Sequence, residues 1–263
     1  MKKYLVIGNP IEHSLSPKLH NYWLKKNNIK GIYEKKKLDE KELKNIIKDV
    51  KDDKIHGLNV TVPFKNQVLP FLDQLTPKAI ISQSVNTIFK DADEVVGDNT
   101  DIGGFELSLK HFKHNLNNKK IFILGAGGVT SSIILALKKI GVLKIFLSNR
   151  TKEKAENLKK IHKDLEIIDW GKFSNFDVII NTTSLGLKKE DEIKLDFSKI
   201  GNKKLFYDII YNHSKTKFLE NGEKLGNKIL NGKMMFIYQA QLAFNIWHNI
   251  LPKVDDVVIK LLD

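Results

Sequence analysis

The stretch KKIFILGAGGVTSSIILALKKIG, residues 119–141, carries the signal that decides the fold. It reads as an apolar strand, a glycine turn and a helix. Glycines at 125, 127 and 128 allow backbone N–H groups and a helix N-terminus to approach a pyrophosphate. The dinucleotide-binding fingerprint has Gly or Ala three residues after its second glycine, where this chain has Thr130. Taken alone, the motif leaves an ordinary strand–helix turn as the alternative.

The end of the next predicted strand distinguishes between two cofactors. NAD-binding domains place an acidic residue about 20 positions on, where it binds the ribose 2′-hydroxyl. This chain has SNRTKEK there, with Asn149, Arg150, Thr151 and Lys154 and no acid at the strand end. Arg150 is the only arginine among 44 cationic residues, and a guanidinium can both bind a phosphate and stack on adenine. NADP is therefore favoured over NAD, and the alternative is an exposed arginine that opens a helix.

Strand and helix signals alternate on both sides of this motif. After it, strands are predicted at 144–150, 176–184 and 204–210, with a helix at 151–163. Before it, strands at 4–8, 32–38, 58–63, 84–90 and 94–101 alternate with helices at 16–28 and 39–53. A long apolar helix is predicted at 234–251. Alternation of this kind predicts an α/β fold.

We therefore expect two α/β domains. An N-terminal substrate-binding domain with a mostly parallel sheet should cover residues 1–101 and be completed by C-terminal helices over 233–263. A Rossmann-like NADP-binding domain should cover 102–232. The hinges are expected near 101–104 and near Gly232.

Composition narrows the class of protein. The 263 residues are 41% hydrophobic and 9% aromatic, which is typical of a globular chain. There is no cysteine, which excludes disulfides and thiolate chemistry and favours a reducing compartment. No apolar run reaches the roughly 18 residues of a membrane span, so we expect a soluble, cytoplasmic protein that binds no membrane.

Net charge and histidine spacing disfavour two further classes of function. The net charge is +13, but the lysines are spread through nearly every segment among acidic residues. Single-stranded nucleic acid would need a basic groove interleaved with aromatic side chains, and no such pattern is present. The histidines show no metal-ligand spacing, so no metal is expected.

Polar side chains gather where the strands of the first hundred residues end. In GLNVTVPFK, 57–65, Asn59 and Thr61 share one face of a strand that should stop at Pro63, and Lys65 follows. Further groups occur in HSLSP, SVNT and GDNTD, which supply Ser14, Ser16, Asn86, Asn99 and Asp101. Each set is expected at or just past the C-terminal end of a strand, where open α/β sheets bind ligands. Hydroxyls, amides, one lysine and one carboxylate suit a small, polyhydroxylated anion.

Some of the candidate residues also have a purely structural explanation. Ser16 can be the N-cap of a helix that begins at Pro17, whereas Ser14 lacks that explanation. Lys65 alone would be one surface lysine among many. Gln239 lies on an otherwise apolar helix and needs a polar partner if it is buried.

Taken in order, these motifs resemble the shikimate dehydrogenase family across nearly the whole chain. The residues that carry the resemblance are GNPIEHSLSPKLHN, NVTVPFK, VNT, GDNTD, GAGGV, SNRT, NTTSLG, YDIIY and the two glutamines of QAQ. The resemblance implies an oxidoreductase that interconverts 3-dehydroshikimate and shikimate reversibly with NADP(H), in chorismate and aromatic amino-acid biosynthesis. It implies Lys65 and Asp101 as the catalytic pair, and it leaves a monomer or a homodimer open.

The resemblance also assigns binding residues. The substrate contacts it implies, together with the residues argued above, are Ser14, Ser16, Asn59, Thr61, Asn86, Asp101, Tyr211 and Gln239. The implied cofactor contacts are Gly125, Ala126, Gly127, Gly128, Val129, Asn149, Arg150, Thr151, Lys154, Ile209 and Gly232. The chain departs from the family pattern at Met234, where Gly is common, and at Thr183, where Ala is common.

Reduction of a carbonyl by hydride also needs one proton, which the protein must deliver. As hydride reaches the carbonyl carbon, negative charge grows on the carbonyl oxygen, and a lysine ammonium can stabilise it and deliver the proton. The sequence leaves open whether Lys65 acts alone or through Asp101. The competing hypotheses are a quinate/shikimate enzyme that uses NAD and a non-catalytic NADP-binding protein.

Overall fold

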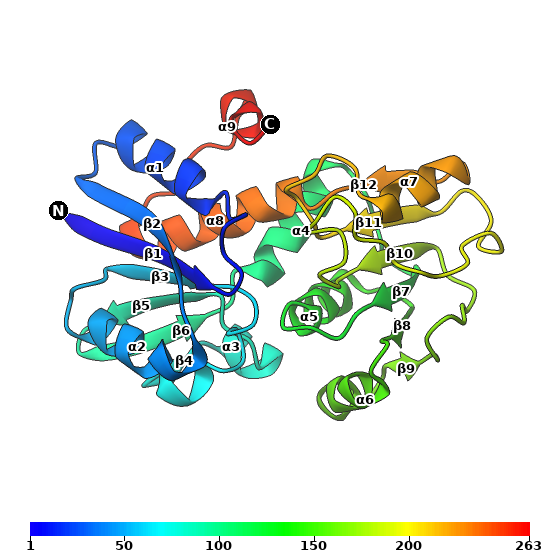
Figure 1. Ribbon diagram of the computed structural model, residues 1–263, viewed down its shortest axis with the longest axis horizontal. Coiled ribbons are helices and arrows are strands. Elements are labelled where there is room, and N and C mark those ends of the chain that lie inside the picture. Colours follow the sequence, from blue (N-terminus) through cyan, green and yellow to red (C-terminus); the bar gives the residue numbers. More distant parts are fainter. The chain divides into compact units, whose positions relative to one another are not determined.

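The computed structural model describes all 263 residues, and they form two compact units. The first unit comprises Met1–Ser108 and Phe236–Asp263, and the second comprises Leu109–Met235. Both chain crossings lie inside helices, α4 (Asp101–His111) and α8 (Lys233–His248) (Figure 1). The domain limits expected from sequence, near 101 and 232, stay a prediction.

The first unit is built on a six-stranded sheet in the order β2-β1-β3-β5-β6-β4. Three of its five neighbouring pairs are parallel and the two that involve β5 are antiparallel. The sheet is therefore mixed and mainly parallel, as the sequence predicted. Its strands are β1 (Lys2–Gly8), β2 (Gly31–Lys37), β3 (Gly57–Val60), β4 (Gln74–Leu75), β5 (Thr87–Asp91) and β6 (Glu94–Asp98).

Helices cover both faces of this sheet (Figure 1). On one face lie α1 (Ser16–Lys26) and α8, where the Trp247 ring stacks on Tyr4 of β1 at 5.5 Å. On the other face, apolar residues of α2 (Leu43–Lys51) and α3 (Pro77–Ser82) join Leu5 and Leu58 in one core. The remaining pieces of the unit are η1 (Glu40–Glu42), η2 (Leu69–Phe71) and α9 (Asp256–Leu261).

The antiparallel β5 decides where Asn86 lies. Sequence reasoning placed Asn86 within a strand at 84–90 and grouped it with residues that follow strand ends. The structure corrects this: β5 begins at Thr87, so Asn86 precedes it. Because β5 runs against β3 and β6, its beginning shares a sheet edge with their carboxyl ends. The expected clustering of polar residues at that edge therefore occurs by a different route.

The second unit is a six-stranded, all-parallel sheet in the order β12-β11-β10-β7-β8-β9. After β7, the strands β8 and β9 are added on one side of it, and β10 to β12 are then added on the other, as in a Rossmann fold. Such sheets bind ligands at this switch point, which here lies between β7 and β10. Its strands are β7 (Lys120–Leu124), β8 (Lys144–Ser148), β9 (Glu166–Ile167), β10 (Val178–Asn181), β11 (Leu205–Asp208) and β12 (Lys228–Leu230). Its helices are α5 (Thr130–Ile140), α6 (Lys152–Ile161) and α7 (Lys217–Lys224), and the core is rich in phenylalanine.

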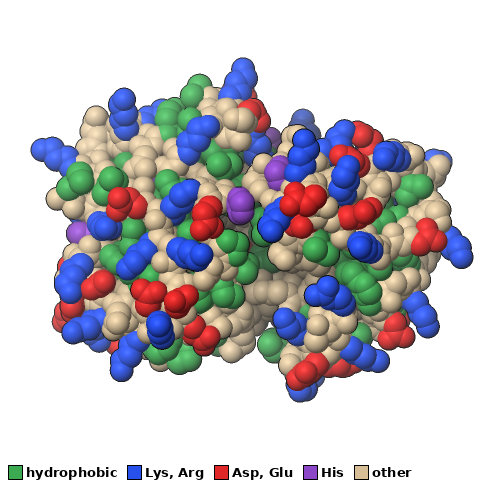
Figure 2. Space-filling view, in the orientation of Figure 1, with side chains coloured by type: hydrophobic (Ala, Val, Ile, Leu, Met, Phe, Trp, Pro, Cys, Tyr) green, Lys and Arg blue, Asp and Glu red, His purple; other side chains and the backbone are tan.

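Two further observations concern the chain as a whole. None of its helices combines the length and the hydropathy needed to cross a bilayer. Figure 2 shows basic and acidic side chains interspersed over the visible face rather than sorted into a basic stripe. The α/β class expected from sequence is confirmed.

Candidate active site

Lys65 and Asp101 form a buried ion pair at one edge of the first sheet. The Lys65 Nζ lies 2.6 Å from the Asp101 Oδ2, and the two side chains are only 11% and 6% exposed. The Lys65 backbone is fixed where its carbonyl accepts the Val85 N–H at 2.9 Å. Asp101 is the first residue of α4, where the unpaired N–H groups of a helix start favour a carboxylate. Residues 36 positions apart in sequence are thus brought into direct contact.

Asn86 holds the second carboxylate oxygen of Asp101. Its Nδ2 donates to Asp101 Oδ1 at 3.0 Å and to Gln239 Oε1 at 3.3 Å. Its Oδ1 accepts the Thr100 N–H at 2.7 Å, which fixes the orientation of the amide. Gln239 in turn donates to the Phe236 carbonyl of α8. The structure therefore brings Lys65, Asn86, Asp101 and Gln239 together, and the polar partner expected for Gln239 is Asn86.

Three hydroxyls follow the ends of β1 and β3. The prediction that Ser16 is the N-cap of its helix is wrong, because α1 starts at Ser16 and its cap residue is Leu15. The Ser14 Oγ accepts the N–H of Ser16, the first residue of α1, at 3.3 Å. Ser16 and Thr61 make no side-chain hydrogen bond within the protein and remain able to bind a ligand.

Asn59 is buried beneath this edge rather than open to it. It is 6% exposed, and its Nδ2 donates to the Asn86 carbonyl at 3.0 Å and to Thr87 Oγ1 at 2.6 Å. Its Oδ1 accepts the Tyr33 hydroxyl at 2.7 Å. Both the NH₂ group and the oxygen of the Asn59 side chain therefore have hydrogen-bond partners inside the protein. The assignment of Asn59 as a substrate contact stays a prediction.

The glycine turn of the second unit follows β7. Gly125 adopts a φ of +108°, and a Cβ there would lie 2.9 Å from the Thr183 N. Gly127 is exposed, and the nearest atom to a Cβ there is 3.8 Å away. Glycine at 125 is thus required by the backbone conformation of the turn and by its close packing. Glycine at 127 instead leaves open space beside the backbone. The neighbouring Gly128 and Val129 lead directly into α5.

Thr130 explains the departure from the dinucleotide fingerprint. Its hydroxyl donates to the Gly125 carbonyl at 3.2 Å and accepts the Gly127 N–H at 3.0 Å. It also lies 2.9 Å from the hydroxyl of Thr182, just past β10. A threonine here ties the turn to both strands at the switch point. Sequence reasoning missed Thr182, because the strand predicted at 176–184 included it, whereas β10 ends at Asn181.

The loop after β8 carries the residues expected to select the cofactor. Asn149 accepts the Ala126 N–H at 3.1 Å and donates to the Thr151 carbonyl at 2.7 Å, so it joins this loop to the glycine turn. Arg150 is exposed and makes no hydrogen bond or ion pair. Thr151 is the cap residue of α6, and Lys154 is exposed on its first turn. An unpaired guanidinium on a loop that is hydrogen-bonded to an open glycine turn fits a phosphorylated dinucleotide.

The segment after β11 places the other residues assigned to the second unit. Gly232 donates its N–H to the Ile210 carbonyl at 2.9 Å and lies against the Ile209 backbone. Tyr211 is half-buried and Met234 is buried. The assignment of Tyr211 as a substrate contact stays a prediction.

Asp208, at the end of β11, is the most strongly perturbed acid of this segment. Burial raises the pKa of its carboxyl from 3.8 to about 7. Hydrogen bonds donated by Thr216, by the Ile210 N–H and by Asn181 oppose that shift without cancelling it. The protein therefore stabilises the neutral form of this acid.

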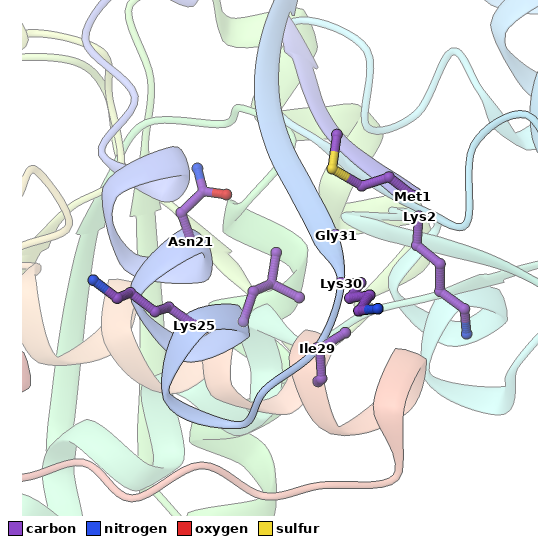
Figure 3. Close-up of a pocket in the computed structure, with 8 residues that line it drawn as sticks. Met1, Lys2, Asn21, Lys25, Ile29, Lys30 and Gly31 are labelled. Atoms are coloured by element: carbon purple, nitrogen blue, oxygen red, sulfur yellow. The ribbon is translucent and has the colours of Figure 1, made fainter.

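An open hollow of the first unit lies away from Lys65 and Asp101. It has a volume of about 700 Å³ and is lined by Met1, Lys2, Asn21, Leu24, Lys25, Ile29, Lys30 and Gly31 (Figure 3). These residues surround the beginnings of β1 and β2, whereas Lys65 and Asp101 follow the carboxyl ends of β3 and β6. This hollow therefore lies at the opposite end of the parallel strands from Lys65 and Asp101.

Comparisons with known proteins agree over the full length. The model of the shikimate dehydrogenase substrate-binding domain matches residues 6–88, and that of shikimate/quinate 5-dehydrogenase matches residues 106–209. The chain is 60% identical over 262 residues to a shikimate dehydrogenase (NADP(+)) of Pelagibacter ubique, which covers 100% of this chain and 99% of the relative.

Two solved structures are similar throughout. The shikimate dehydrogenase of Aquifex aeolicus has a TM-score of 0.89 at 36% identity and covers 100% of this chain and 97% of its own. That of Thermus thermophilus, in complex with NADP(H) and shikimate, has a TM-score of 0.89 at 29% identity and covers 100% and 98%. The chain therefore belongs to the NADP-dependent shikimate dehydrogenase family.

Proposed function

We propose that this chain reduces 3-dehydroshikimate to shikimate reversibly with NADPH, and that Lys65 and Asp101 handle the proton. The observation that carries the assignment of roles is the buried contact of 2.6 Å between these two residues at a ligand-binding edge. An ion pair withdrawn from water is costly to maintain, so a pair of this kind beside free hydroxyls favours a functional explanation.

The first unit supplies groups suited to a small hydroxylated carboxylic acid. Ser14, Ser16 and Thr61 offer hydroxyls after the ends of β1 and β3, and we assign them to the carboxylate and ring hydroxyls of the substrate. Asn86 and Gln239 lie beside Asp101 and present amide groups at the same edge. Tyr211 of the second unit is kept as a further substrate contact.

Lys65 is assigned the proton transfer. In the direction of reduction its ammonium donates a proton to the oxygen of the substrate carbonyl, whose carbon becomes the C–OH carbon of shikimate. In the reverse direction the neutral amine accepts that proton. Asp101 stabilises and orients the ammonium and can also hold a substrate hydroxyl, and Asn86 fixes the Asp101 carboxylate from its other side.

The second unit is assigned to the cofactor. NADP(H), when bound, supplies or accepts the hydride. The turn from Gly125 to Val129 would receive the pyrophosphate at the start of α5. Arg150 and Lys154, with Asn149 and Thr151, would hold the 2′-phosphate, and the backbone at Ile209 and Gly232 would face the nicotinamide end.

A spectrophotometric assay tests the proposal. Adding shikimate and NADP⁺ to the purified protein should raise the absorbance of the reduced nicotinamide, with a much smaller rate for NAD⁺ and for quinate. A preference for NAD⁺ with quinate would instead support the quinate enzyme. Tight NADP⁺ binding without any turnover would support a non-catalytic binding protein.

Two expectations from sequence belong to the same proposal. We propose that the enzyme acts in the cytoplasm, because a chain without cysteine needs no disulfides and suits a reducing compartment. We also propose a monomer or homodimer, which sedimentation equilibrium distinguishes. Neither affects the roles assigned to Lys65 and Asp101.

A further inference from the structure

Tyr33 is a buried tyrosine of β2 that donates its hydroxyl into the polar group beneath the active site. It is 1% exposed, and its Oη lies 2.7 Å from Asn59 Oδ1. Asn21 of α1 holds the Tyr33 backbone from both sides, since it donates to the carbonyl at 2.8 Å and accepts the N–H at 2.9 Å. The His20 ring stacks on the tyrosine ring at 4.2 Å, with 7° between the planes. The position of the hydroxyl is thus fixed by its surroundings.

The directions of the following hydrogen bonds are determined by groups that can act in only one way. Asn59 must direct its NH₂ toward the Asn86 carbonyl, because a carbonyl only accepts. The Asn59 oxygen therefore faces Tyr33, whose hydroxyl must donate. Asn86 must direct its oxygen toward the Thr100 N–H, so its NH₂ faces Asp101.

These bonds form one continuous chain to the catalytic pair. It runs from the Tyr33 hydroxyl to the Asn59 side chain, from Asn59 to the Asn86 backbone, and from the Asn86 side chain to Asp101. Asp101 then contacts Lys65. Tyr33, Asn59, Asn86 and Asp101 are all buried, so water does not substitute readily for a lost member.

We propose that Tyr33 is a positioning residue for catalysis, which acts through Asn59 and Asn86 on the orientation of Asp101 and Lys65. This inference rests on the roles proposed above for the catalytic pair. Removing the hydroxyl leaves the Asn59 oxygen buried without a donor. Asn59 then gains by reorienting, which weakens its hold on Asn86 and lets the Asp101 carboxylate turn away from its productive position.

The variant Tyr33→Phe removes only the hydroxyl. We expect kcat for shikimate oxidation to fall about tenfold with KM changed less than about threefold, because small misplacements of reacting groups are costly while the substrate contacts remain. Tyr4→Phe is the matched control. Tyr4 is the register partner of Tyr33 on β1 and is equally buried, but its hydroxyl makes no hydrogen bond.

A double-mutant cycle separates positioning from general stability. Asn59→Ala cuts the same chain one step later and should also lower kcat. Adding Tyr33→Phe to Asn59→Ala should then lower kcat no further, because the hydroxyl has lost the residue through which it acts. Urea unfolding of each variant records stability separately from kcat.

Three outcomes would overturn the inference: an unchanged kcat in Tyr33→Phe, an equal loss in Tyr4→Phe, or an undiminished effect of Tyr33→Phe in the Asn59→Ala background. If Tyr33→Phe is too unstable to assay, an unchanged kcat in Asn59→Ala has the same consequence. Lys65→Ala is assayed in parallel. If Lys65→Ala is fully active, the proposed function itself has failed, whereas an inactive Lys65→Ala with a normal Tyr33→Phe rejects only the role of Tyr33.

Discussion

Gly232 packs so closely against Ile209 that a Cβ at 232 would lie 2.0 Å from the Ile209 carbonyl oxygen and 2.4 Å from its carbonyl carbon. Both neighbours are backbone atoms, which cannot swing away as the end of a long side chain can. The contact joins the end of β11 to the start of α8. A glycine at 232 is therefore required by packing, whatever its part in holding a cofactor.

Gly232→Ala should lower the free energy of unfolding by about 3 kcal/mol or more, since the methyl group forces two backbone segments apart. Urea denaturation followed by circular dichroism measures this. A stability equal to that of the unmodified protein would mean that the approach of Ile209 and Gly232 is not as described.

Gly127→Ala, in contrast, should weaken cofactor binding and leave stability nearly unchanged. A Cβ there meets no atom closer than 3.8 Å, so the free energy of unfolding should change by less than about 0.5 kcal/mol. The methyl group would occupy the space beside the turn, and we expect NADP⁺ to bind about tenfold more weakly, as measured by calorimetry. Unchanged affinity would show that the pyrophosphate does not approach this face of the turn.

The second unit was largely predictable because its signals are local. Parallel strands buried on both faces read as apolar runs, and the glycine turn identifies the first of them. The missed elements include β9 and β12, which are two and three residues long and too short to show a period. The eight-residue helix α7 was missed as well. From sequence, Thr130 is only a departure from the dinucleotide-binding pattern. Its hydrogen-bond partners Gly125 and Thr182 are recognised only in the structure, where the ends of β7 and β10 lie together.

The first unit shows the limits of sequence reasoning more clearly. The alternation of residues predicts a strand near Asn86 but not its direction, which is fixed by pairing with distant strands. The same limit applies to Asn59, which was predicted as a polar ligand contact on one face of a strand. The Asn59 oxygen is instead bonded inside the protein by Tyr33, which lies 26 positions away in the sequence. Lys65 and Asp101 were identified from motifs, whereas the chain of side chains that supports them was not.

Lys65→Ala should lower kcat by about 10²- to 10⁴-fold while shikimate still binds, because the proton donor is lost and the hydroxyl contacts remain. Steady-state rates and equilibrium binding of shikimate measure the two effects. Lys90→Ala is a suitable control, since Lys90 also forms a 2.6 Å ion pair, with the exposed Asp53. Normal turnover in Lys65→Ala would refute the assigned role.

Arg150→Ala should weaken NADP⁺ binding by about 10- to 100-fold, as expected for the loss of charge-assisted hydrogen bonds to a phosphate. NAD⁺, which has no 2′-phosphate, should lose far less. Calorimetric titration of both cofactors measures the ratio, and Lys160→Ala, near the end of the helix α6 that follows Arg150, controls for a general loss of positive charge. Equal losses for NADP⁺ and NAD⁺ would remove the 2′-phosphate from this site.

Asp208 predicts a pH dependence of stability with a definite sign. Burial raises the pKa of its carboxyl from 3.8 in the unfolded chain to about 7 in the fold, so between these values the folded protein binds the extra proton. Its contribution to stability is complete below about pH 4 and is lost as the pH rises through about 7. At about 1.4 kcal/mol per pKa unit, the loss amounts to a few kcal/mol.

The variant Asp208→Asn isolates this contribution, because an amide resembles the neutral acid and does not titrate. The difference in unfolding free energy between the unmodified protein and Asp208→Asn should move in favour of the variant by a few kcal/mol from pH 5 to pH 8. Burial lowers the pKa of His20 to about 3 and that of His162 to about 4, so their contribution to stability is lost as the pH falls below about 6.5. This contribution is the same in both proteins and cancels in the difference between them. A difference that is constant with pH would mean that Asp208 is already ionised at pH 5 and that its three hydrogen bonds outweigh its burial.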